Sequence, residues 1–340
     1  MRRGWRGWLA VAAIAVPTTG AAQSSSVARL APGQTCSFVT QAHANESAGE
    51  PNIAHDGTPL PGIPAPDISQ GFRGIPRSAQ PPLTESQRRI LECSYVLDEA
   101  NAEMPYTLFV PTGYDPGTPT PLVVDLHGLN ITPLMQILFD GTTDFAEEHG
   151  FMVVAPMGYS VAGWWGARDG EPVETADENP ATGDPYAVGQ LSEIDAMHLL
   201  AMIRERYNVD PDRIYLMGHS MGGAGTYHLA AKYNDVWAAA VPLSGAGGIR
   251  DEETAMRFQS LPTLIMHGEM DSIVPAATSR RSVMWLQSVG APHLYLEFPG
   301  KDHEFWIRRG AENMEKVFLF FDTVSKRNGV GHITEQMVSP

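Results

Sequence analysis

The chain contains 340 residues, of which 39 are acidic and 23 are basic, so its formal net charge is −16. This excess of acidic side chains argues against nucleic acid and anionic membranes as partners, because both are bound through basic surfaces. The simplest interpretation of the composition is a soluble protein with an acidic surface.

The first 22 residues have the pattern of a secretory signal peptide. Basic residues near the start precede an apolar run from Trp8 to Val16, and the small residues of Gly20–Ala22 form a candidate cleavage site. The apolar run is far shorter than the roughly 20 residues that a membrane-spanning helix needs. We therefore expect residues 1–22 to be removed on export, with no membrane anchor remaining, and the mature protein to be secreted or periplasmic.

Residues 23–90 are rich in Pro, Gly, Ser and Ala and show no sustained hydrophobic periodicity. This composition predicts an N-terminal extension or linker. The two cysteines of the chain are Cys36, within this extension, and Cys93. In an oxidising compartment they are expected to form a disulfide that ties the extension to the following domain; the alternative is two unpaired thiols.

From about Leu91 onward, short apolar runs alternate with helical patterns. The run Leu122–Leu126 is almost entirely apolar, which predicts a central strand buried on both faces. A helical segment ends at Gly150, a residue type favoured just beyond the C-terminus of a helix. The predicted strands are Tyr106–Val110, Leu122–Leu126, Phe151–Ala155, Ile214–Met217, Ala238–Val241, Leu264–Met266 and Leu294–Phe298.

The segment Leu191–Tyr207 carries apolar residues at the i, i+3, i+4, i+7 spacing of an amphipathic helix. Ser192 followed by Asp195 resembles a capping box, which predicts that the helix begins there. Strands and helices that alternate in this way predict an α/β fold with a mostly parallel sheet and helices on both faces. We expect one such domain over residues 91–326, followed by a tail at 327–340.

The strongest chemical motif is the pentapeptide Gly218–Gly222, which has the form G-x-S-x-G and lies between a predicted strand and a predicted helix. In such an elbow the serine is presented on a strained turn, and the small flanking residues avoid collisions. This context predicts that Ser220 is a nucleophile rather than an ordinary turn residue.

A serine hydroxyl needs a general base, and in proteins with this elbow the acid and then the histidine follow the serine along the chain. Asp271 lies just beyond the predicted strand Leu264–Met266 and is the preferred acid, with Glu269 as its nearest rival and Asp251 as a weaker one. His303 follows the last predicted strand and is the expected base.

An oxyanion hole would complete this machinery. Its donors are predicted to be the backbone N–H of Met221, directly after the nucleophile, and that of Leu129 in the loop after Leu122–Leu126, with Gly128 as rival. The neighbouring His127 and His219 are interpreted as structural residues that pack or hydrogen-bond these two loops.

Six segments together have the pattern of a known superfamily; they are Asp125–Gly128, Val154–Pro156, Gly163–Gly166, Val209–Tyr215, Gly218–Gly223 and His267–Pro275. On these segments, the chain from about Tyr106 to Phe321 resembles the α/β-hydrolases. It is closest in pattern to the polyhydroxybutyrate-depolymerase-like and feruloyl-esterase-like serine esterases, with dienelactone hydrolases and prolyl oligopeptidases as cousins.

The resemblance implies hydrolysis of carboxylic esters through an acyl-enzyme, with neither a metal nor another cofactor. The implied substrate is a small-molecule or oligomeric ester of the feruloyl, acetyl or hydroxyalkanoate type. Because one fold serves many substrates, the resemblance does not choose among them.

Two further features bear on substrate binding. Trp164, Trp165 and Trp306 are candidates for an aromatic platform, and the alternative is that at least one of them packs in the core. The acidic stretch from Asp169 to Asp184 lies where active-site loops emerge. A calcium site there is not expected, because its acidic residues lack a recognisable ligand spacing; they are Asp169, Glu171, Glu174, Asp177 and Glu178.

Two alternative functions compete with ester hydrolysis. A serine peptidase similar to prolyl oligopeptidases is less favoured, because residues 23–90 are too irregular to form the propeller domain that gates peptides in that family. A catalytically silent binding protein on a hydrolase scaffold is least favoured, because all three triad positions are filled.

Overall fold

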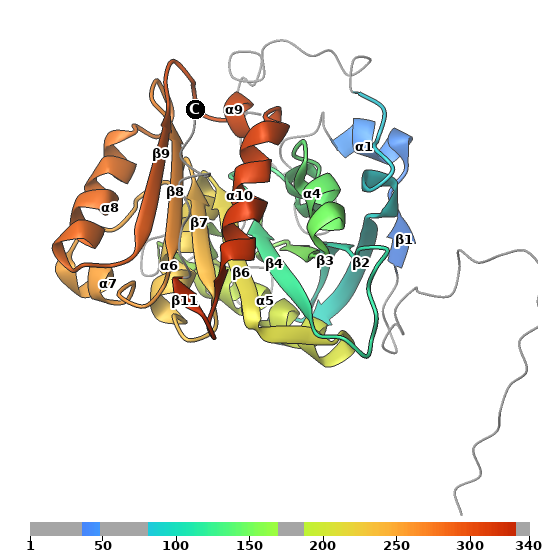
Figure 1. The fold of residues 1–340 in the computed structure, drawn as a ribbon. Coiled ribbons are helices and arrows are strands. Elements are labelled where there is room, and N and C mark those ends of the chain that lie inside the picture. The colour runs from blue at the N-terminus through green and yellow to red at the C-terminus, as the bar shows by residue number, and fades with distance from the viewer. Residues whose placement is uncertain (1–35, 48–80, 169–186, 331–340) are drawn as a thin grey trace, which may run out of the picture.

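A nine-stranded mixed sheet runs through the described residues, 36–47, 81–168 and 187–330, of this computed structural model (Figure 1). The strand order is β1-β2-β3-β5-β4-β6-β7-β8-β9. The predicted signal peptide, the acidic stretch after Arg168 and the end of the predicted tail lie outside the described residues. The α/β fold class expected from the alternating pattern is confirmed.

Six strands form the parallel part of the sheet. Each bound of the seven predicted strands lies within five residues of the observed one. Strand β4 lies between β5 and β6, in the middle of the sheet, as its apolar sequence predicted. The six strands are β4 (Thr120–Leu126), β5 (Met152–Pro156), β6 (Val209–His219), β7 (Ala239–Leu243), β8 (Thr263–Gly268) and β9 (His293–Phe298).

The other edge of the sheet is antiparallel and consists of β1 (Cys36–Phe38), β2 (Leu91–Leu97) and β3 (Ala102–Phe109). Strands β1 and β2 place Cys36 opposite Cys93, and the two residues form a disulfide. The described part of the predicted extension therefore packs on the domain. Its helix α1 (Gln41–Ser47) and the short η2 (Gln87–Arg89) complete this edge.

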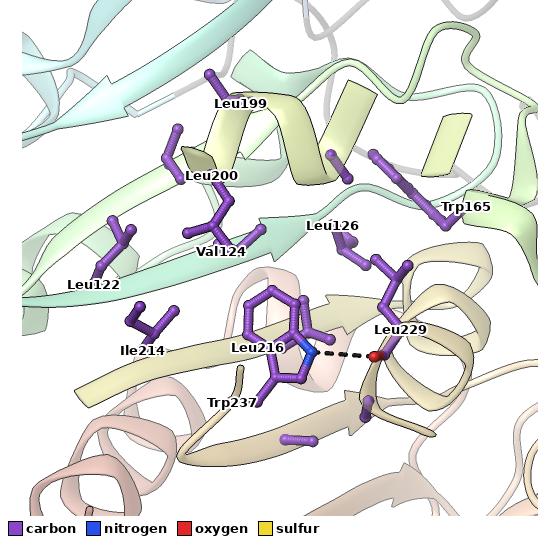
Figure 2. Packing of buried hydrophobic residues seen from close by; sticks show 14 of the residues in the cluster. Leu122, Val124, Leu126, Trp165, Leu199, Leu200, Ile214, Leu216, Leu229 and Trp237 are labelled. Atoms are coloured by element: carbon purple, nitrogen blue, oxygen red, sulfur yellow. Dashed lines mark hydrogen bonds between the residues drawn. The ribbon is translucent and has the colours of Figure 1, made fainter. Parts of the chain in front are cut away.

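The sheet separates two hydrophobic cores, as the alternation of side chains along a strand requires. Leu122, Val124 and Leu126 of β4 face one core, whereas Val123 faces the other. Figure 2 shows the first core, where Trp237 donates a hydrogen bond to the Leu229 carbonyl (3.1 Å).

Helices cover both faces, as predicted. The first core is covered by α5 (Ala187–Arg206), α6 (Met221–Lys232), α7 (Glu252–Met256) and α8 (Ala277–Ser288). The second is covered by α3 (Pro133–Ile137), α4 (Thr142–His149), α9 (Phe305–Arg308) and α10 (Ala311–Thr323). Helix α4 ends at His149, and Gly150 follows it in the left-handed conformation, as expected. A small hairpin, β10 (Val324–Ser325) and β11 (Gly329–Val330), follows. No helix within the described ranges combines the length and the apolar character needed to cross a membrane.

The predicted start of helix α5 is wrong. The helix begins at Ala187, so Ser192 and Asp195 lie inside it, fully buried, and do not form a capping box. In the interior of a helix the backbone N–H groups are already bonded within the helix, so a side-chain oxygen there is available to neighbouring segments. Both residues use their oxygens to hold the loop after β5.

Candidate active site

Ser220 occupies a strained turn between β6 and α6. Its backbone has φ 59° and ψ −113°, a conformation that non-glycine residues rarely adopt. Its N–H donates to the Leu243 carbonyl (2.9 Å), and its own carbonyl accepts from the N–H groups of Ala224 (3.0 Å) and Ala246 (3.1 Å). These bonds hold the turn from three sides, which is how surrounding structure maintains a strained conformation at a reactive residue.

Glycines around the serine let the elbow pack closely against the strands. A Cβ atom added to Gly222 would lie 1.9 Å from the Leu126 carbonyl oxygen, and one added to Gly218 would lie 2.5 Å from the carbonyl oxygen of Gly222. Both contacts are with backbone, which cannot move aside as a flexible side chain can. The small residues of the motif are therefore required by the packing of the elbow, as predicted.

Gly222→Ala is expected to destabilise the protein by about 3 kcal/mol, since overpacking against backbone forces the elbow and β4 apart. Urea unfolding of the purified variant, or its loss from the soluble fraction, checks this. Gly113→Ala is the matched control, because a Cβ atom there meets nothing within 4 Å. Equal stability of the two variants would contradict the packing argument.

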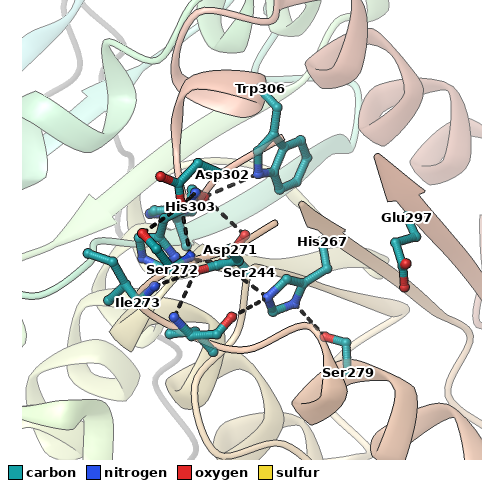
Figure 3. A network of polar contacts seen from close by, with 12 residues as sticks. Ser244, His267, Asp271, Ser272, Ile273, Ser279, Glu297, Asp302, His303 and Trp306 are labelled. Carbon is teal, nitrogen blue, oxygen red and sulfur yellow. Dashed lines mark hydrogen bonds and ion pairs between the residues drawn. The ribbon is translucent and has the colours of Figure 1, made fainter. Parts of the chain in front are cut away.

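Asp271 and His303 form a buried pair at the ends of neighbouring strands, as Figure 3 shows. Asp271 follows β8 and His303 follows β9, and Oδ2 of the aspartate lies 2.7 Å from Nδ1 of the histidine. The His303 ring centre lies 4.8 Å from that of His219, the residue before the nucleophile. The fold thus brings the three residues predicted as a triad to one edge of the sheet.

The environment of Asp271 favours its ionised form. Burial raises its pKa, but hydrogen bonds from His267 and His303, and from the Val274 N–H, outweigh burial and hold the pKa well below its usual range. The Ile273 N–H also donates to Oδ1. An ionised carboxylate facing Nδ1 can fix the tautomer of His303 that leaves Nε2 free to accept a proton.

The rival acids are engaged elsewhere. Glu269 is exposed, and its Oε2 accepts from the Gly300 N–H (3.0 Å). Asp251 is exposed and caps helix α7 through the Thr254 N–H (2.8 Å). Of these three acids, Asp271 is the one that contacts His303.

A second set of contacts fixes the loop that carries His303. The backbone carbonyl of His303 accepts from Ser244 Oγ (3.0 Å), Trp306 Nε1 (3.1 Å) and His219 Nε2 (3.1 Å). Burial and the nearby His303 lower the pKa of His219 to about 3, so the His219 ring stays neutral. The structural role predicted for His219 is confirmed by this contact.

The predicted oxyanion donors lie beside the elbow. Met221 is the first residue of α6, so its N–H has no acceptor within the helix. A Cβ atom added to Gly128 would lie 3.5 Å from Cβ of Ser220, which places the loop of Gly128 and the exposed Leu129 against the nucleophile. The assignment of Leu129 and Met221 as donors stays a prediction.

The loop after β4 is held by the loop after β5. His127 Nε2 lies 2.7 Å from the Met157 carbonyl, and the Trp165 indole donates to the His127 carbonyl (3.2 Å). The Asn130 N–H donates to the Val161 carbonyl (2.9 Å). The structural role predicted for His127 is confirmed, and burial lowers its pKa.

Asp195 supports this arrangement from α5, a role that the sequence pattern hid behind an apparent helix cap. Its Oδ2 accepts from the Gly158 N–H (2.6 Å), and its Oδ1 accepts from the Tyr95 hydroxyl. Ser192 Oγ accepts from the Trp165 N–H (3.0 Å). Burial raises the pKa of Asp195 to about 6, although these donors lower it. The sequence did hold a signal for this role. Ser192 and Asp195 lie about one turn apart, and apolar residues precede them, so the helix could begin earlier and enclose both.

The aromatic platform predicted from three tryptophans is wrong for two of them. Trp165 is fully buried between the two loops, and Trp306 is 3% exposed and stacks on Phe298 at 4.6 Å. Both donate their indole N–H to backbone carbonyls, so neither presents a free face to a substrate. Trp164 is partly exposed, with the Arg168 guanidinium 3.6 Å from its ring centre. The five acids considered for calcium lie outside the described residues.

An unpaired carboxyl oxygen lies in β4, three residues before Gly128. Asp125 in β4 is fully buried, and its Oδ1 accepts from Nε2 of Gln136 in α3 (2.9 Å). The other oxygen of each side chain, Asp125 Oδ2 and Gln136 Oε1, is buried without a hydrogen-bond partner among the described residues. Burial raises the pKa of Asp125 to about 7. A protonated Asp125 could donate to Gln136 and satisfy both oxygens.

Asp125→Asn is expected to stabilise the protein at pH 8 and to change little at pH 4. The pKa of Asp125 rises from 3.8 in the unfolded chain to about 7 in the native state, so the native state holds the proton more tightly and loses stability as pH rises between these values. At about 1.4 kcal/mol per unit, the loss reaches about 4 kcal/mol. Asparagine stays neutral and can donate to Gln136 at every pH.

Chemical unfolding of both proteins from pH 4 to pH 9 measures the difference. Asp98→Asn, an exposed acid in the turn after β2, is the control for the general effect of removing one charge. A difference between wild type and Asp125→Asn that stays constant across this range would contradict a buried, protonated Asp125.

Comparison with known proteins identifies the family of this chain. Residues 98–312, more than half of the chain, match the family Esterase, described as "Putative esterase". The sequence is 29% identical over 167 residues to the bifunctional acetylxylan esterase/xylanase of Neocallimastix patriciarum, covering 49% of this chain and 21% of that protein. It is 32% identical over 207 residues to cutinase 2 of Thermobifida cellulosilytica, covering 53% of this chain and 76% of that protein.

Among solved structures, the ferulic acid esterase of Anaeromyces mucronatus is similar with a TM-score of 0.52 and 22% identity, covering 67% of this chain and 88% of that one. At this identity the likeness shows the fold. The chain spans only about one fifth of the Neocallimastix protein, which is named as a xylanase as well as an acetylxylan esterase.

Proposed function

The chain belongs to the Esterase family of α/β-hydrolases, and on that premise we propose that it hydrolyses carboxylic esters through an acyl-enzyme on Ser220. The observation that carries the proposal is the 2.7 Å contact between Asp271 and His303 beside the strained elbow of Ser220. A nucleophile, a base and a group that orients the base are what acyl transfer by a serine requires.

In the proposed reaction, Ser220 Oγ attacks the ester carbonyl carbon while its proton passes to Nε2 of His303. The carbonyl oxygen becomes an oxyanion and accepts hydrogen bonds from the Met221 and Leu129 N–H groups. The C–O bond to the alcohol then breaks, and the alcohol leaves with the proton from His303. Water repeats the sequence on the acyl-enzyme, releasing the acid and restoring Ser220.

The substrate class is proposed to be feruloyl, acetyl or hydroxyalkanoate esters, small or oligomeric. The similarity to an acetylxylan esterase/xylanase and a cutinase supports this range. We also propose export, on the signal-peptide pattern of residues 1–22 and the Cys36–Cys93 disulfide, since disulfides persist in oxidising compartments.

A competition assay tests the function. Purified enzyme is given methyl ferulate, a hydroxybutyrate oligomer, an acetylated xylo-oligosaccharide and a prolyl peptide together, and the products are followed by mass spectrometry. Relative consumption of the esters reports relative kcat/KM and so identifies the substrate class. Cleavage of the peptide alone would support a peptidase instead, and an absence of both cleavage and acyl-enzyme would support a silent scaffold.

A further inference from the structure

An open cavity of about 660 Å³ lies along helix α6, beside the proposed active site. Five residues of α6 line it at i, i+3, i+4, i+7 and i+8, which is one face of the helix; they are Ala224, Tyr227, His228, Ala231 and Lys232. The loop after β7 and the start of α7 form a second wall, and Trp164 with Arg168 forms a third. None of the triad residues lines this cavity, so it is a separate space.

The cavity begins next to the nucleophile. Ala224 and Ala246 both line it, and both donate their N–H to the Ser220 carbonyl. With a rise of about 1.5 Å per residue, the α6 wall runs from about 6 Å to about 18 Å beyond Ser220 along the helix axis. The near end of this wall is thus about 6 Å from Ser220 along the helix axis, and the subsite proposed below requires a substrate arm of at least that length.

The lining is basic, although the whole chain is strongly acidic. Lys232 and three arginines line the cavity together with two acids; the arginines are Arg168, Arg250 and Arg257, and the acids are Asp251 and Glu253. The chain as a whole has 39 acidic and 23 basic residues. A concentration of positive charge in a concave part of an acidic protein favours an anionic ligand there.

The three arginines have no acidic partner among the described residues. Within the described ranges, none of the three has a carboxylate partner within 4.0 Å. Lys232 differs, because its Nζ lies 2.6 Å from Glu193, which also contacts His228 at 2.7 Å. Arg250 and Arg257 are both exposed, so their guanidinium groups are accessible to a ligand, and guanidinium matches the planar carboxylate group.

We propose that this cavity is a subsite for a carboxylate carried by the ester substrate, on an arm that extends away from the scissile bond. The proposal rests on the proposed esterase function and narrows it to esters with an anionic end, such as partly hydrolysed oligomers of hydroxy acids. Arg250 and Arg257 bind the carboxylate, and Arg168 on the Trp164 ring completes the positive wall.

The test compares each carboxylate-bearing ester with its methyl ester, which lacks the negative charge. One pair places the carboxylate on the acyl side, namely 4-nitrophenyl hydrogen suberate and its methyl ester. The other places it on the alcohol side, namely the butyrate ester of 8-hydroxyoctanoic acid and its methyl ester. We expect kcat/KM for the acid to exceed that for the methyl ester about 10-fold or more in at least one pair, in agreement with a charge-assisted hydrogen bond to arginine. The preference should decline with added salt.

In Arg250→Gln/Arg257→Gln, the preference is expected to fall to near unity. The ratio is measured within one preparation, so it is independent of the fraction of folded enzyme. Arg204→Gln, an exposed arginine of α5 outside the cavity, is the control and should keep the wild-type ratio. Hydrolysis of the methyl esters without any preference for the acids would overturn the subsite while leaving the esterase function intact. A preference that survives in the double variant would overturn it equally, whereas failure to hydrolyse any ester would overturn the function itself.

Discussion

Ser220→Ala is expected to lower kcat for ester hydrolysis by about 10⁶-fold while leaving the protein folded. The hydroxyl oxygen is the atom that would form the acyl-enzyme, and no other group in the proposed mechanism can replace it. Folding should be retained, because the elbow is held by backbone hydrogen bonds of residue 220 that alanine keeps. Steady-state kinetics on a nitrophenyl ester measures the loss.

The intermediate gives a second measurement. Mass spectrometry of the quenched wild-type reaction should show the enzyme heavier by one acyl group, and the Ser220→Ala sample should show no such species. Ser288→Ala, an exposed serine at the end of α8, controls for loss of a hydroxyl elsewhere. An acyl adduct on the Ser220→Ala protein would assign the nucleophile to another residue.

Asp271→Asn is expected to lower kcat by about 10⁴-fold, with the fold intact. Oδ1 of Asp271 accepts two backbone N–H groups, from Ile273 and Val274. The amide oxygen of asparagine must occupy that position, which leaves its NH₂ group facing Nδ1 of His303. Nδ1 is then forced to accept, so the proton moves to Nε2 and the base is lost. The negative charge that stabilises the imidazolium is also lost.

The nearby acids provide matched controls for this substitution. Glu269→Gln and Asp251→Asn also remove a carboxylate, but both residues are exposed and neither contacts His303. Their kcat values are expected to stay close to that of the wild type. A large loss in Glu269→Gln together with a small one in Asp271→Asn would reverse the assignment of the acid.

The pH dependence of Asp271 follows from the direction of its pKa shift. A carboxylate with a depressed native pKa contributes stability that is present above the unfolded pKa and is lost as pH falls through the native one. Asp271 therefore stays ionised throughout the neutral range, and its titration is not expected to limit activity there. Asp125 has the opposite sign, because its native pKa is raised and its contribution declines as pH rises.

Much of the site was predictable from the sequence because its signals are local. The elbow needs small residues within two positions of Ser220, and strands of a parallel sheet place the residues that follow them at one edge. Because the acid and then the histidine follow the serine along the chain, each after the end of a strand, the sequence predicted Asp271 and His303. The α/β architecture was predictable for the same reason, because the apolar pattern of each predicted strand covers fewer than ten consecutive residues.

Other features depend on contacts between distant segments, and these only the tertiary structure decided. Asp195 has a spacing typical of a helix cap, yet its carboxylate binds the hydroxyl of Tyr95, which lies 100 residues earlier. Tryptophan serves equally in cores and in binding sites, and only the burial of Trp165 and Trp306 by other segments shows that both belong to the core. Composition and periodicity describe what one segment favours by itself. The partner of a buried polar or aromatic side chain is chosen only when sheet order brings separate segments together, because burial makes each polar atom require a specific donor or acceptor.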